Sequence, residues 1–262
     1  MVAVINILED DFKTKFWISE VLRNFEWWQK KVFVVKIREK IQIVKIFKNY
    51  SKRDIRELEI YEKYKNNNFL PKIINITEYK WDTIVFEELI EWQTLEECKN
   101  EYKWNQKKII KLVKDIIDVL EELWDDEIVH RDIKPSNIII SNGKPYVIDF
   151  WIAKNLNLSS ITEAWFQPWT RSFMSPEQLL WKNKLISYRS DFFSIGVLTY
   201  YLYYWNYPFW TDIENISEMF TSWNVDYNID ENCPLTIFLE WILHIKPHLR
   251  PRNTNILLKL LP

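Results

Sequence analysis

Short apolar runs dominate the first ninety residues of the chain. They predict strands at residues 18–25, 32–36, 41–47, 73–76 and 83–87. Between the third and fourth runs, residues 51–65 carry apolar side chains at helical spacing behind Ser51, which can cap a helix N-terminus. This third of the chain is therefore predicted to be mainly sheet with one helix. Residues 1–17 are interpreted as an N-terminal extension with a short helix or strand.

The remaining two thirds have mainly helical patterning. Residues 105–124 place their apolar side chains on one stripe, as an amphipathic helix does: Ile109, Leu112, Val113, Ile116, Leu120 and Leu123. Shorter helices are predicted near residues 213–220, 235–245 and 253–261. Residues 192–210 carry no charge, but their polar residues and five tyrosines favour a buried helix and loop over a membrane span. No internal repeat, linker or second domain is apparent.

Two apolar runs in the middle of the chain predict a hairpin. Residues 138–140 and 146–148 are joined by Ser-Asn-Gly-Lys-Pro, a sequence that suits a turn. Asp132, Lys134 and Asn137 precede the first run, and Asp149 follows the second. Folding the hairpin brings these four side chains to one end of a small sheet. Phosphoryl transfer needs such a group, because a carboxylate must orient the attacking hydroxyl and oxygen ligands must hold magnesium.

These residues also resemble a family signature. The stretch His130-Arg131-Asp132-Ile133-Lys134-Pro135-Ser136-Asn137 is similar to the catalytic loop H-R-D-x-K-x-x-N of the protein kinases, and Asp149-Phe150 to the start of D-F-G. The chain resembles the eukaryotic-like (Hanks-type) Ser/Thr kinases of bacteria over about residues 18–262. The resemblance implies an α+β, two-lobed fold with ATP in the cleft between the lobes. A small β-rich N-lobe is expected at about 18–87, a hinge at about 87–92 and a larger helical C-lobe at about 93–262.

The resemblance assigns a role to each polar residue of the hairpin. Asp132 is expected to align the substrate hydroxyl and accept its proton, and Lys134 to contact the γ-phosphate. Asn137 and Asp149 are the expected ligands of Mg²⁺. In the family, a lysine two places after the catalytic aspartate accompanies Ser/Thr specificity, so protein Ser and Thr hydroxyls are the expected acceptors.

The nucleotide-binding lysine is less sharply marked. Ile43-Val44-Lys45 resembles the V-A-I-K strand of the family, which favours Lys45 as the residue that holds the α- and β-phosphates. Val34-Val35-Lys36 offers Lys36 as an alternative. Glu57 lies in a segment that resembles the kinase αC helix and is the expected ion-pair partner of Lys45.

Two further nucleotide contacts follow from the resemblance. Residues 26–32 are similar to a degenerate phosphate-covering loop, with Trp27, Trp28 and Val32 at its key positions, although a competing register places this loop at residues 14–21. Residues 87–92 resemble the hinge. Phe86 then takes the gatekeeper position, and backbone groups of Glu87 and Leu89 would hold adenine.

Three residues of the C-lobe are expected to act in structure and not in chemistry. Met174-Ser175-Pro176-Glu177 resembles the A-P-E motif, whose glutamate, Glu177, would pair with Arg250. Asp191 resembles the aspartate that begins a buried helix and braces the catalytic loop. The polar residues 155–167 are typical of an activation loop. Hydroxyls in and just after it could be phosphorylated and pair with Arg131: Ser159, Ser160, Thr162, Thr170 and Ser172.

The composition argues against several other classes of protein. The chain has 262 residues, 47% of them hydrophobic, which is ample for a core, and its net charge of −2 gives no reason to expect nucleic acid or an anionic membrane as partner. Two cysteines imply no disulfide framework and fit a reducing, cytoplasmic compartment. Three histidines without a Cys/His cluster make a zinc site unexpected. The first residues do not have the pattern of a signal peptide.

Glycine and tryptophan depart from ordinary usage. There are 2 glycines, where about 18 are expected at average usage, and 15 tryptophans. Trp151 stands at the glycine of D-F-G, Trp169 at a glycine of the activation segment, and Trp27-Trp28 where a phosphate loop needs small residues. Our hypothesis is that many of these codons specify glycine in the source organism. Trp124 and Trp241, on helical patterns, are candidates for genuine tryptophans.

Two other functions are compatible with the same fold. If Trp27, Trp28 and Trp151 are genuine, their indole rings could occupy phosphate space, and the chain would be a pseudokinase that acts as a binding scaffold. A kinase of small molecules is the second alternative. Arg131, the Ser-Pro-Glu segment and the helix of Asp191 favour a protein substrate over a small one.

Overall fold

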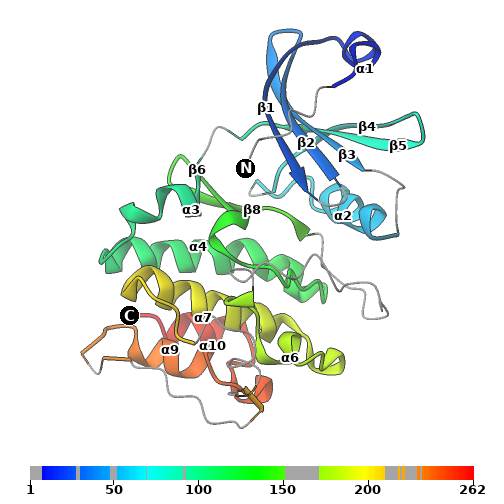
Figure 1. Cartoon of the computed structure of the whole chain (residues 1–262). Helices are drawn as coiled ribbons and strands as arrows, with labels where there is room; N and C mark the ends of the chain where they lie inside the picture. Colours follow the sequence, from blue (N-terminus) through cyan, green and yellow to red (C-terminus); the bar gives the residue numbers. More distant parts are fainter. Residues whose placement is uncertain are drawn as a thin grey trace. The chain divides into compact units, whose positions relative to one another are not determined.

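The computed structural model describes residues 8–27, 30–47, 52–68, 70–90, 93–150, 171–209, 218, 220–221, 229–230 and 232–262. The chain divides into two compact units, residues 1–91 and 92–262, and this division lies inside the stretch predicted as the hinge. The first unit is mainly sheet and the second mainly helix, which is the expected α+β composition (Figure 1).

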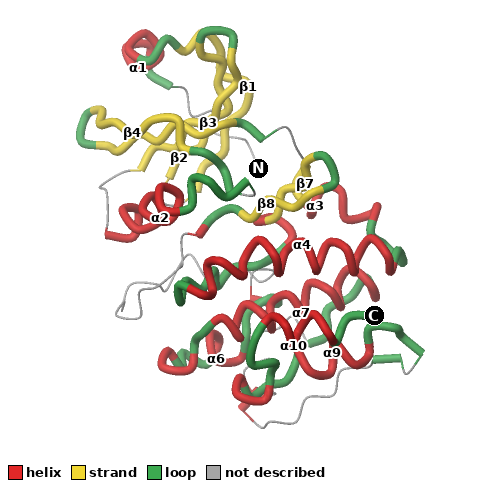
Figure 2. Tube along the Cα trace, turned by 180° about the vertical axis from the view of Figure 1, so that it is seen from behind, coloured by secondary structure: helices red, strands yellow, loops and turns green. Residues whose placement is uncertain are grey.

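The N-terminal unit is built on a five-stranded antiparallel sheet (yellow in Figure 2). Its strands are β1 (Ile18–Trp27), β2 (Lys30–Ile37), β3 (Lys40–Phe47), β4 (Ile73–Tyr79) and β5 (Asp82–Glu88), in the order β1-β2-β3-β5-β4. Each corresponds to one of the predicted strands, so the strand prediction is confirmed. Because β3 and β5 are inner strands, both are fixed by neighbours on either side.

Two helices accompany this sheet, α1 (Asp10–Lys15) and α2 (Lys52–Lys63). In the register, Val44 lies opposite Phe86 and Lys45 opposite Val85, so side chains alternate between two faces. Phe12 of α1 packs on the face of Val44 and Phe86. The segment interpreted as an N-terminal extension therefore contributes a helix to the core of this unit.

The opposite face of the sheet packs against α2. Leu58 of this helix forms a cluster with Phe47 of β3 and Val85 of β5. Tyr61, one turn further along α2, lies with its ring centroid 5.6 Å from Nζ of Lys45. The sheet thus separates an apolar face under α1 from a face under α2 that carries the charged Lys45.

The C-terminal unit combines a small sheet with helices. The three-stranded sheet has the order β6 (Gln93–Thr94), β7 (Ile138–Ser141) and β8 (Lys144–Val147). The α-helices with described bounds are α3 (Leu95–Cys98), α4 (Gln106–Asp125), α6 (Pro176–Leu179), α7 (Tyr188–Tyr204), α9 (Thr236–Ile242) and α10 (Thr254–Lys259). Short 3₁₀ turns are η1 (Lys99–Glu101), η2 (Pro135–Asn137), η5 (Asn183–Leu185) and η6 (Pro247–Leu249).

The long helices of this unit follow from the sequence pattern. The predicted helix 105–124 is α4, which Asn105 caps by accepting a hydrogen bond from the Lys108 N–H, and its predicted stripe is buried. The uncharged run at 192–210 supplies most of α7, which is buried along nearly its whole length, so the prediction of a buried helix is confirmed. In the described part of the chain, no helix has both the length and the apolarity to cross a membrane. The predicted helix near residues 213–220 lies largely outside the described residues.

Several tryptophans have a backbone conformation that suits glycine. Among the described residues, twelve non-glycine residues have positive φ, and five of them are tryptophan: Trp17, Trp81, Trp104, Trp181 and Trp205. A bulky L-residue in this region is an outlier, because its Cβ approaches the backbone too closely. The backbone supports the hypothesis that these positions are natural glycines, which stays a prediction. Trp28, Trp92, Trp151, Trp169 and Trp210 lie outside the described residues.

Candidate functional site

The catalytic-loop residues form one compact cluster in the C-terminal unit. Oδ2 of Asp132 accepts a hydrogen bond from Asn137 Nδ2 at 2.8 Å and lies 2.9 Å from Nζ of Lys134. Asn137 Nδ2 also donates to the backbone oxygen of Asp132 at 2.8 Å. The side chains of Lys134 and Asp132 are only 9% and 13% exposed. The carboxylate of Asp132, the ammonium group of Lys134 and the amide of Asn137 therefore lie together. Both side-chain contacts use Oδ2 of Asp132, and neither uses its Oδ1.

The turn at Asp149 is fastened to this loop by its neighbours. The Ile148 N–H donates to the backbone oxygen of Asn137 at 3.0 Å, and Nε2 of His130 lies 3.0 Å from the Ile148 oxygen. The rings of His130 and Phe150 meet edge to face, with centroids 4.6 Å apart. Since Asp149 lies between Ile148 and Phe150, the structure brings all four polar residues of the predicted hairpin to one place. The backbone of Asp149 itself has a left-handed φ of 63°.

The oxygens at this place fit a magnesium ion whose coordination is completed by substrate. Because Nδ2 of Asn137 is turned toward Asp132, its Oδ1 is turned away and can act as a ligand. Asp149 supplies a carboxylate. Among the described residues there is no group of three or more His, Cys, Asp or Glu side chains that could hold a metal. Magnesium usually takes one or two protein oxygens together with phosphates and water, so this sparse donor set suits it.

Asp191 of α7 holds the backbone of the catalytic loop by hydrogen bonds. Its Oδ1 accepts the Arg131 N–H and its Oδ2 accepts the His130 N–H, each at 2.8 Å. Burial raises the pKa of this fully buried carboxyl, while His130 and the hydrogen bonds act in the opposite direction. The indole Nε1 of Trp124 donates a third hydrogen bond at 2.8 Å. The predicted contact between Asp191 and the catalytic loop is present. The hydrogen bond from Trp124 to Asp191 was not predicted, because Trp124 lies on the apolar stripe of a helix and its sequence position gives no sign of a polar contact.

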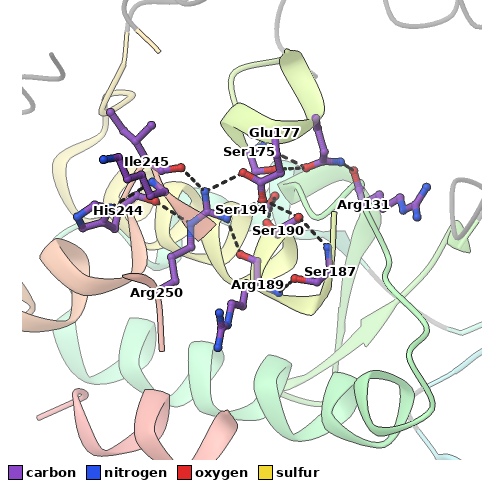
Figure 3. Close-up of polar contacts among 12 residues, drawn as sticks. Arg131, Ser175, Glu177, Ser187, Arg189, Ser190, Ser194, His244, Ile245 and Arg250 are labelled. Atoms are coloured by element: carbon purple, nitrogen blue, oxygen red, sulfur yellow. Dashed lines mark hydrogen bonds and ion pairs between the residues drawn. The ribbon is translucent and has the colours of Figure 1, made fainter. Parts of the chain in front are cut away.

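A second buried network anchors the A-P-E-like segment (Figure 3). Nη1 and Nη2 of Arg250 bond the two carboxylate oxygens of Glu177 at 2.7 and 2.9 Å, so the predicted pair forms. The same guanidinium donates from Nε to the His244 oxygen, from Nη1 to the Arg189 oxygen and from Nη2 to the Ile245 oxygen. All five N–H groups of Arg250 are thus engaged.

The segment also reaches the catalytic loop directly. Nε2 of Gln178 donates to the backbone oxygen of Arg131 at 2.8 Å, and Ser190 donates from Oγ to Glu177 at 2.6 Å (Figure 3). Neither Gln178 nor Ser190 was singled out from the sequence, because a lone glutamine or serine has no distinctive pattern. Arg131 is therefore held on both sides, by Asp191 at its N–H and by Gln178 at its oxygen.

The N-terminal unit places Lys45 on an inner strand. Nζ of Lys45 lies 2.8 Å from Oε1 of Glu87, and the two side chains are 8% and 2% exposed. Val32, opposite Lys45 on β2, shares this face of the sheet. Lys36, the alternative lysine, stands near the end of β2 and pairs with the exposed Glu39. The burial of Lys45 favours it over Lys36.

Two sequence-based expectations stand differently here. The side chain of Glu57, on α2, lies outside what the structure describes, so its pairing with Lys45 stays a prediction, and Glu87 is an additional buried carboxylate beside Lys45. Phe86 was assigned the gatekeeper position, but it packs in the core on the opposite face of the sheet from Lys45. That assignment is corrected, because a one-residue step along a strand reverses the face and Glu87 is the residue that faces Lys45.

The remaining nucleotide-binding predictions can be placed in part. Glu87 lies within β5 and Leu89 just past its end, so their role at adenine stays a prediction. The predicted phosphate-covering loop spans the end of β1 at Trp27 and the start of β2 at Lys30, whereas the competing register falls on α1 and the start of β1. The side chain of Trp27, all of Trp28 and the activation-loop hydroxyls other than Ser172 lie outside the described residues.

Comparison with known proteins agrees with this geometry. Residues 17–259 match the family described as the protein kinase domain. The chain belongs to the protein kinase family. It is 31% identical over 121 residues to a serine/threonine-protein kinase of Myxococcus xanthus, covering 43% of this chain and 22% of the relative. It is 25% identical over 197 residues to a serine/threonine-protein kinase of Arabidopsis thaliana, covering 74% of this chain and 15% of the relative.

A third relative extends over more of the chain. A striated muscle preferentially expressed protein kinase of Danio rerio is 28% identical over 234 residues, which is 84% of this chain and 7% of the relative. The chain spans less than a quarter of the length of each of these three proteins. The similarity therefore concerns the kinase domain and not the remainder of the relatives.

Proposed function

We propose that this kinase domain transfers the γ-phosphoryl group of Mg-ATP to Ser or Thr hydroxyls of proteins. The observation that carries the proposal is the contact of Asp132 with both Lys134 and Asn137, beside the turn that holds Asp149. Such a cluster combines a proton acceptor, a cation and oxygen ligands within a few ångströms. Names of related proteins as serine/threonine kinases add support from similarity.

Each residue has a defined task in this mechanism. Asp132 orients the acceptor hydroxyl and takes its proton as the bond to phosphorus forms, through the oxygen that its two neighbours leave unused. Lys134 contacts the transferred phosphoryl group and stabilises its negative charge. Asn137 and Asp149 would hold Mg²⁺, which supplies charge neutralisation on the phosphates. Lys45 binds the α- and β-phosphates.

Substrate class and location belong to the same proposal. Lys134, two places after Asp132, is the family feature that accompanies Ser/Thr acceptors, and the network of Glu177 and Arg250 supports the segment on which a protein substrate would lie. Cys98 and Cys233 are both free and buried thiols, which fits a reducing compartment such as the cytoplasm.

The decisive experiment is a transfer assay on the full chain with glycine restored at the suspect tryptophan positions. We expect phosphorylation of itself or of a generic protein substrate with Mg-ATP, and loss of transfer in the matched variant Asp132→Asn. Thermal-shift titration with Mg-ATP reports binding separately. Binding without transfer in both proteins would contradict the enzyme and favour the pseudokinase scaffold, and transfer to sugars or aminoglycosides alone would favour a small-molecule kinase.

A further inference from the structure

Trp124 differs from the tryptophans whose backbone suits glycine. It lies in the last turn of α4, where the backbone is helical, and its side chain is 5% exposed. Its ring meets that of Phe192 edge to face, with centroids 5.0 Å apart. By contrast, Trp81 and Trp104 have positive φ and are 95% and 75% exposed. The fold therefore uses a tryptophan side chain at position 124.

The indole N–H of Trp124 is directed at the carboxylate of Asp191. Helices α4 and α7 lie side by side (Figures 1 and 2), and Nε1 of Trp124 donates to Oδ2 of Asp191 at 2.8 Å. The same oxygen accepts the His130 N–H, and Oδ1 accepts the Arg131 N–H. Asp191 is 0% exposed, so water cannot replace a lost donor. In the part of the chain that the structure describes, this carboxylate thus has two donors from the catalytic loop and one from the end of α4.

The hydrogen bond from Trp124 favours the ionised form of Asp191. An indole N–H is a donor only and does not titrate. Burial raises the pKa of the Asp191 carboxyl, and the hydrogen bond from Trp124 is one of the contacts that oppose this rise. The two loop contacts use both carboxylate oxygens, so protonation of either oxygen would remove one of them. Trp124 therefore helps to keep both contacts between Asp191 and the loop.

The loop backbone that Asp191 holds is strained. Arg131 has φ of 70°, and a residue other than glycine keeps such a conformation only where its surroundings hold it. Asp191 holds the N–H of Arg131, and Nε2 of Gln178 holds its oxygen at 2.8 Å. Asp132 follows directly, so a rotation of the Arg131 backbone would turn the carboxylate that contacts Lys134. The strain thus lies one residue before the proposed proton acceptor.

We propose that Trp124 is a positioning residue for phosphoryl transfer. Its indole N–H fixes the carboxylate of Asp191, and this carboxylate holds the strained backbone that places Asp132. The inference rests on the proposed function, since it assumes that Asp132 acts on the acceptor hydroxyl. It adds a residue of α4 to a contact that was expected of Asp191 alone. Because the contacts of Asp191 are with the loop before the proposed Mg²⁺ ligands, the effect is expected in kcat and not in nucleotide binding.

The first test separates turnover from nucleotide binding. Trp124→Phe keeps an aromatic ring against Phe192 and removes the N–H donor. The parent is the full chain with glycine restored at the suspect positions and Trp124 retained. We expect kcat for a generic protein substrate to fall about tenfold or more, as for the loss of a hydrogen bond to a charged group. KM for ATP and the affinity for Mg-ADP should stay within about twofold. An unchanged kcat, or equal losses in kcat and in Mg-ADP affinity, would overturn the proposal.

Trp241 provides the matched control substitution. It is 52% exposed on α9, so Trp241→Phe removes the same N–H and should change kcat by less than about twofold. A second control concerns the route through Asp191. In a chain that already carries Asp191→Asn, Trp124→Phe should lower kcat no further, because the carboxylate through which it acts is gone. A full additional tenfold loss would show that Trp124 acts by another route and would overturn the proposal.

Hydrogen exchange tests the same contact without an activity measurement. By NMR of the parent chain, the indole N–H of Trp124 should exchange at least about a hundredfold more slowly than that of Trp241. In Trp124→Phe, the backbone N–H groups of His130 and Arg131 should exchange at least about tenfold faster, while those within α7 stay within about threefold. Rapid exchange of the Trp124 indole in the parent chain would overturn the proposal even if the Trp124→Phe chain does not fold.

Failure of the proposed function would look different. A parent chain that binds Mg-ADP and transfers phosphate to no protein would contradict that function and any role of Trp124 in turnover, while the exchange measurements would still test the contact with the loop. A parent chain that transfers phosphate, with unchanged kcat and loop exchange in Trp124→Phe, would overturn only the role of Trp124. Glycine at position 124 in the native protein, found by mass spectrometry, would overturn that role as well.

Discussion

Two buried ion pairs, one in each unit, differ in what surrounds them. Glu177 and Arg250 are 1% and 0% exposed, and the guanidinium also bonds three backbone oxygens. Lys45 and Glu87 are similarly buried, but their contact joins two neighbouring strands of one sheet. The first pair joins several chain segments, because Arg250 bonds Glu177 and three backbone oxygens at once. The second pair holds one cation, the lysine that we propose binds the nucleotide phosphates. Two pairs with similar burial therefore differ in how many chain segments depend on them.

Replacing the structural pair should have the largest effect. In Glu177→Leu/Arg250→Met, the oxygens of Arg189, His244 and Ile245 lose their donor. We expect the free energy of unfolding to fall by about 3 kcal/mol or more, because each buried orphan acceptor costs about 1–3 kcal/mol. Urea unfolding, with amide hydrogen exchange in α7 as the local report, measures this loss.

An exposed pair provides the control for that experiment. Lys65 and Glu62 are 62% and 66% exposed, so Lys65→Met should change the free energy of unfolding by less than about 0.5 kcal/mol. A Glu177→Leu/Arg250→Met chain as stable as its parent would contradict a structural role for that pair.

The corresponding change in the sheet should have a smaller effect on stability. We expect Lys45→Met/Glu87→Leu to stay within about 1 kcal/mol of the parent, or to exceed it, because apolar side chains remove the desolvation cost of both charges. Binding of Mg-ADP should fall in the same protein. Hydrogen exchange of β3 amides and an ADP titration give the two readings. A loss of about 3 kcal/mol would instead make this pair structural like the other.

The effect of replacing tryptophan by glycine on stability can be compared between a turn and a helix. Trp81 is 95% exposed, with φ of 70° at the second position of the β4–β5 turn, where glycine is favoured. Trp81→Gly should raise the free energy of unfolding by about 1 kcal/mol, because the left-handed conformation costs a bulky residue about 1–2 kcal/mol. Thermal unfolding measures the change.

Trp241, exposed on helix α9, is the matched control for that substitution. Trp241→Gly should lower the free energy of unfolding by about 1 kcal/mol, the cost of glycine inside a helix. Equal destabilisation by the two substitutions would remove the argument for strain. Mass spectrometry of the native protein tests the underlying hypothesis, and intact tryptophan at positions 27, 28 and 151 would end it.

The smallest expected effect concerns His244, beside Arg250. Burial, and then the positive charges of Arg250, His248 and Lys246, lower the pKa of His244 below its usual value. Its Nδ1 accepts the Lys246 N–H, which only the neutral ring can do. The unfolded chain therefore binds the proton more readily, and stability falls as pH drops through about 6.5 to the lowered pKa.

Substitution of His244 by asparagine separates this effect from other titrations. His244→Asn keeps an acceptor for the Lys246 N–H and cannot titrate, so its stability should vary less between pH 7 and pH 5. Urea midpoints at several pH values measure the difference. Identical slopes for parent and variant would show that His244 does not contribute.

Site contacts between residues close together in sequence could be predicted from the sequence. Contacts that depend on strand register could not. Asp132, Lys134 and Asn137 lie within one loop, and a short hairpin carries Asp149 to them, so local patterns were sufficient. Glu87 meets Lys45 only because β3 pairs with β5 in one particular register. A shift of a single residue exchanges the two faces of a strand, and the family pattern did not show that Phe86 and Lys45 lie on opposite faces. Gln178 was missed for a different reason, since its partner is a backbone oxygen 47 residues away.

The short helix α1 has a practical consequence for anyone choosing where to begin a recombinant fragment. The similarity to the family starts at residue 17, after Leu8 and Phe12 have already entered the core. A fragment cut at that boundary would uncover a contiguous apolar surface over Phe33 and Val44, and surfaces of this kind promote self-association. The folding unit is longer than the stretch that sequence similarity marks.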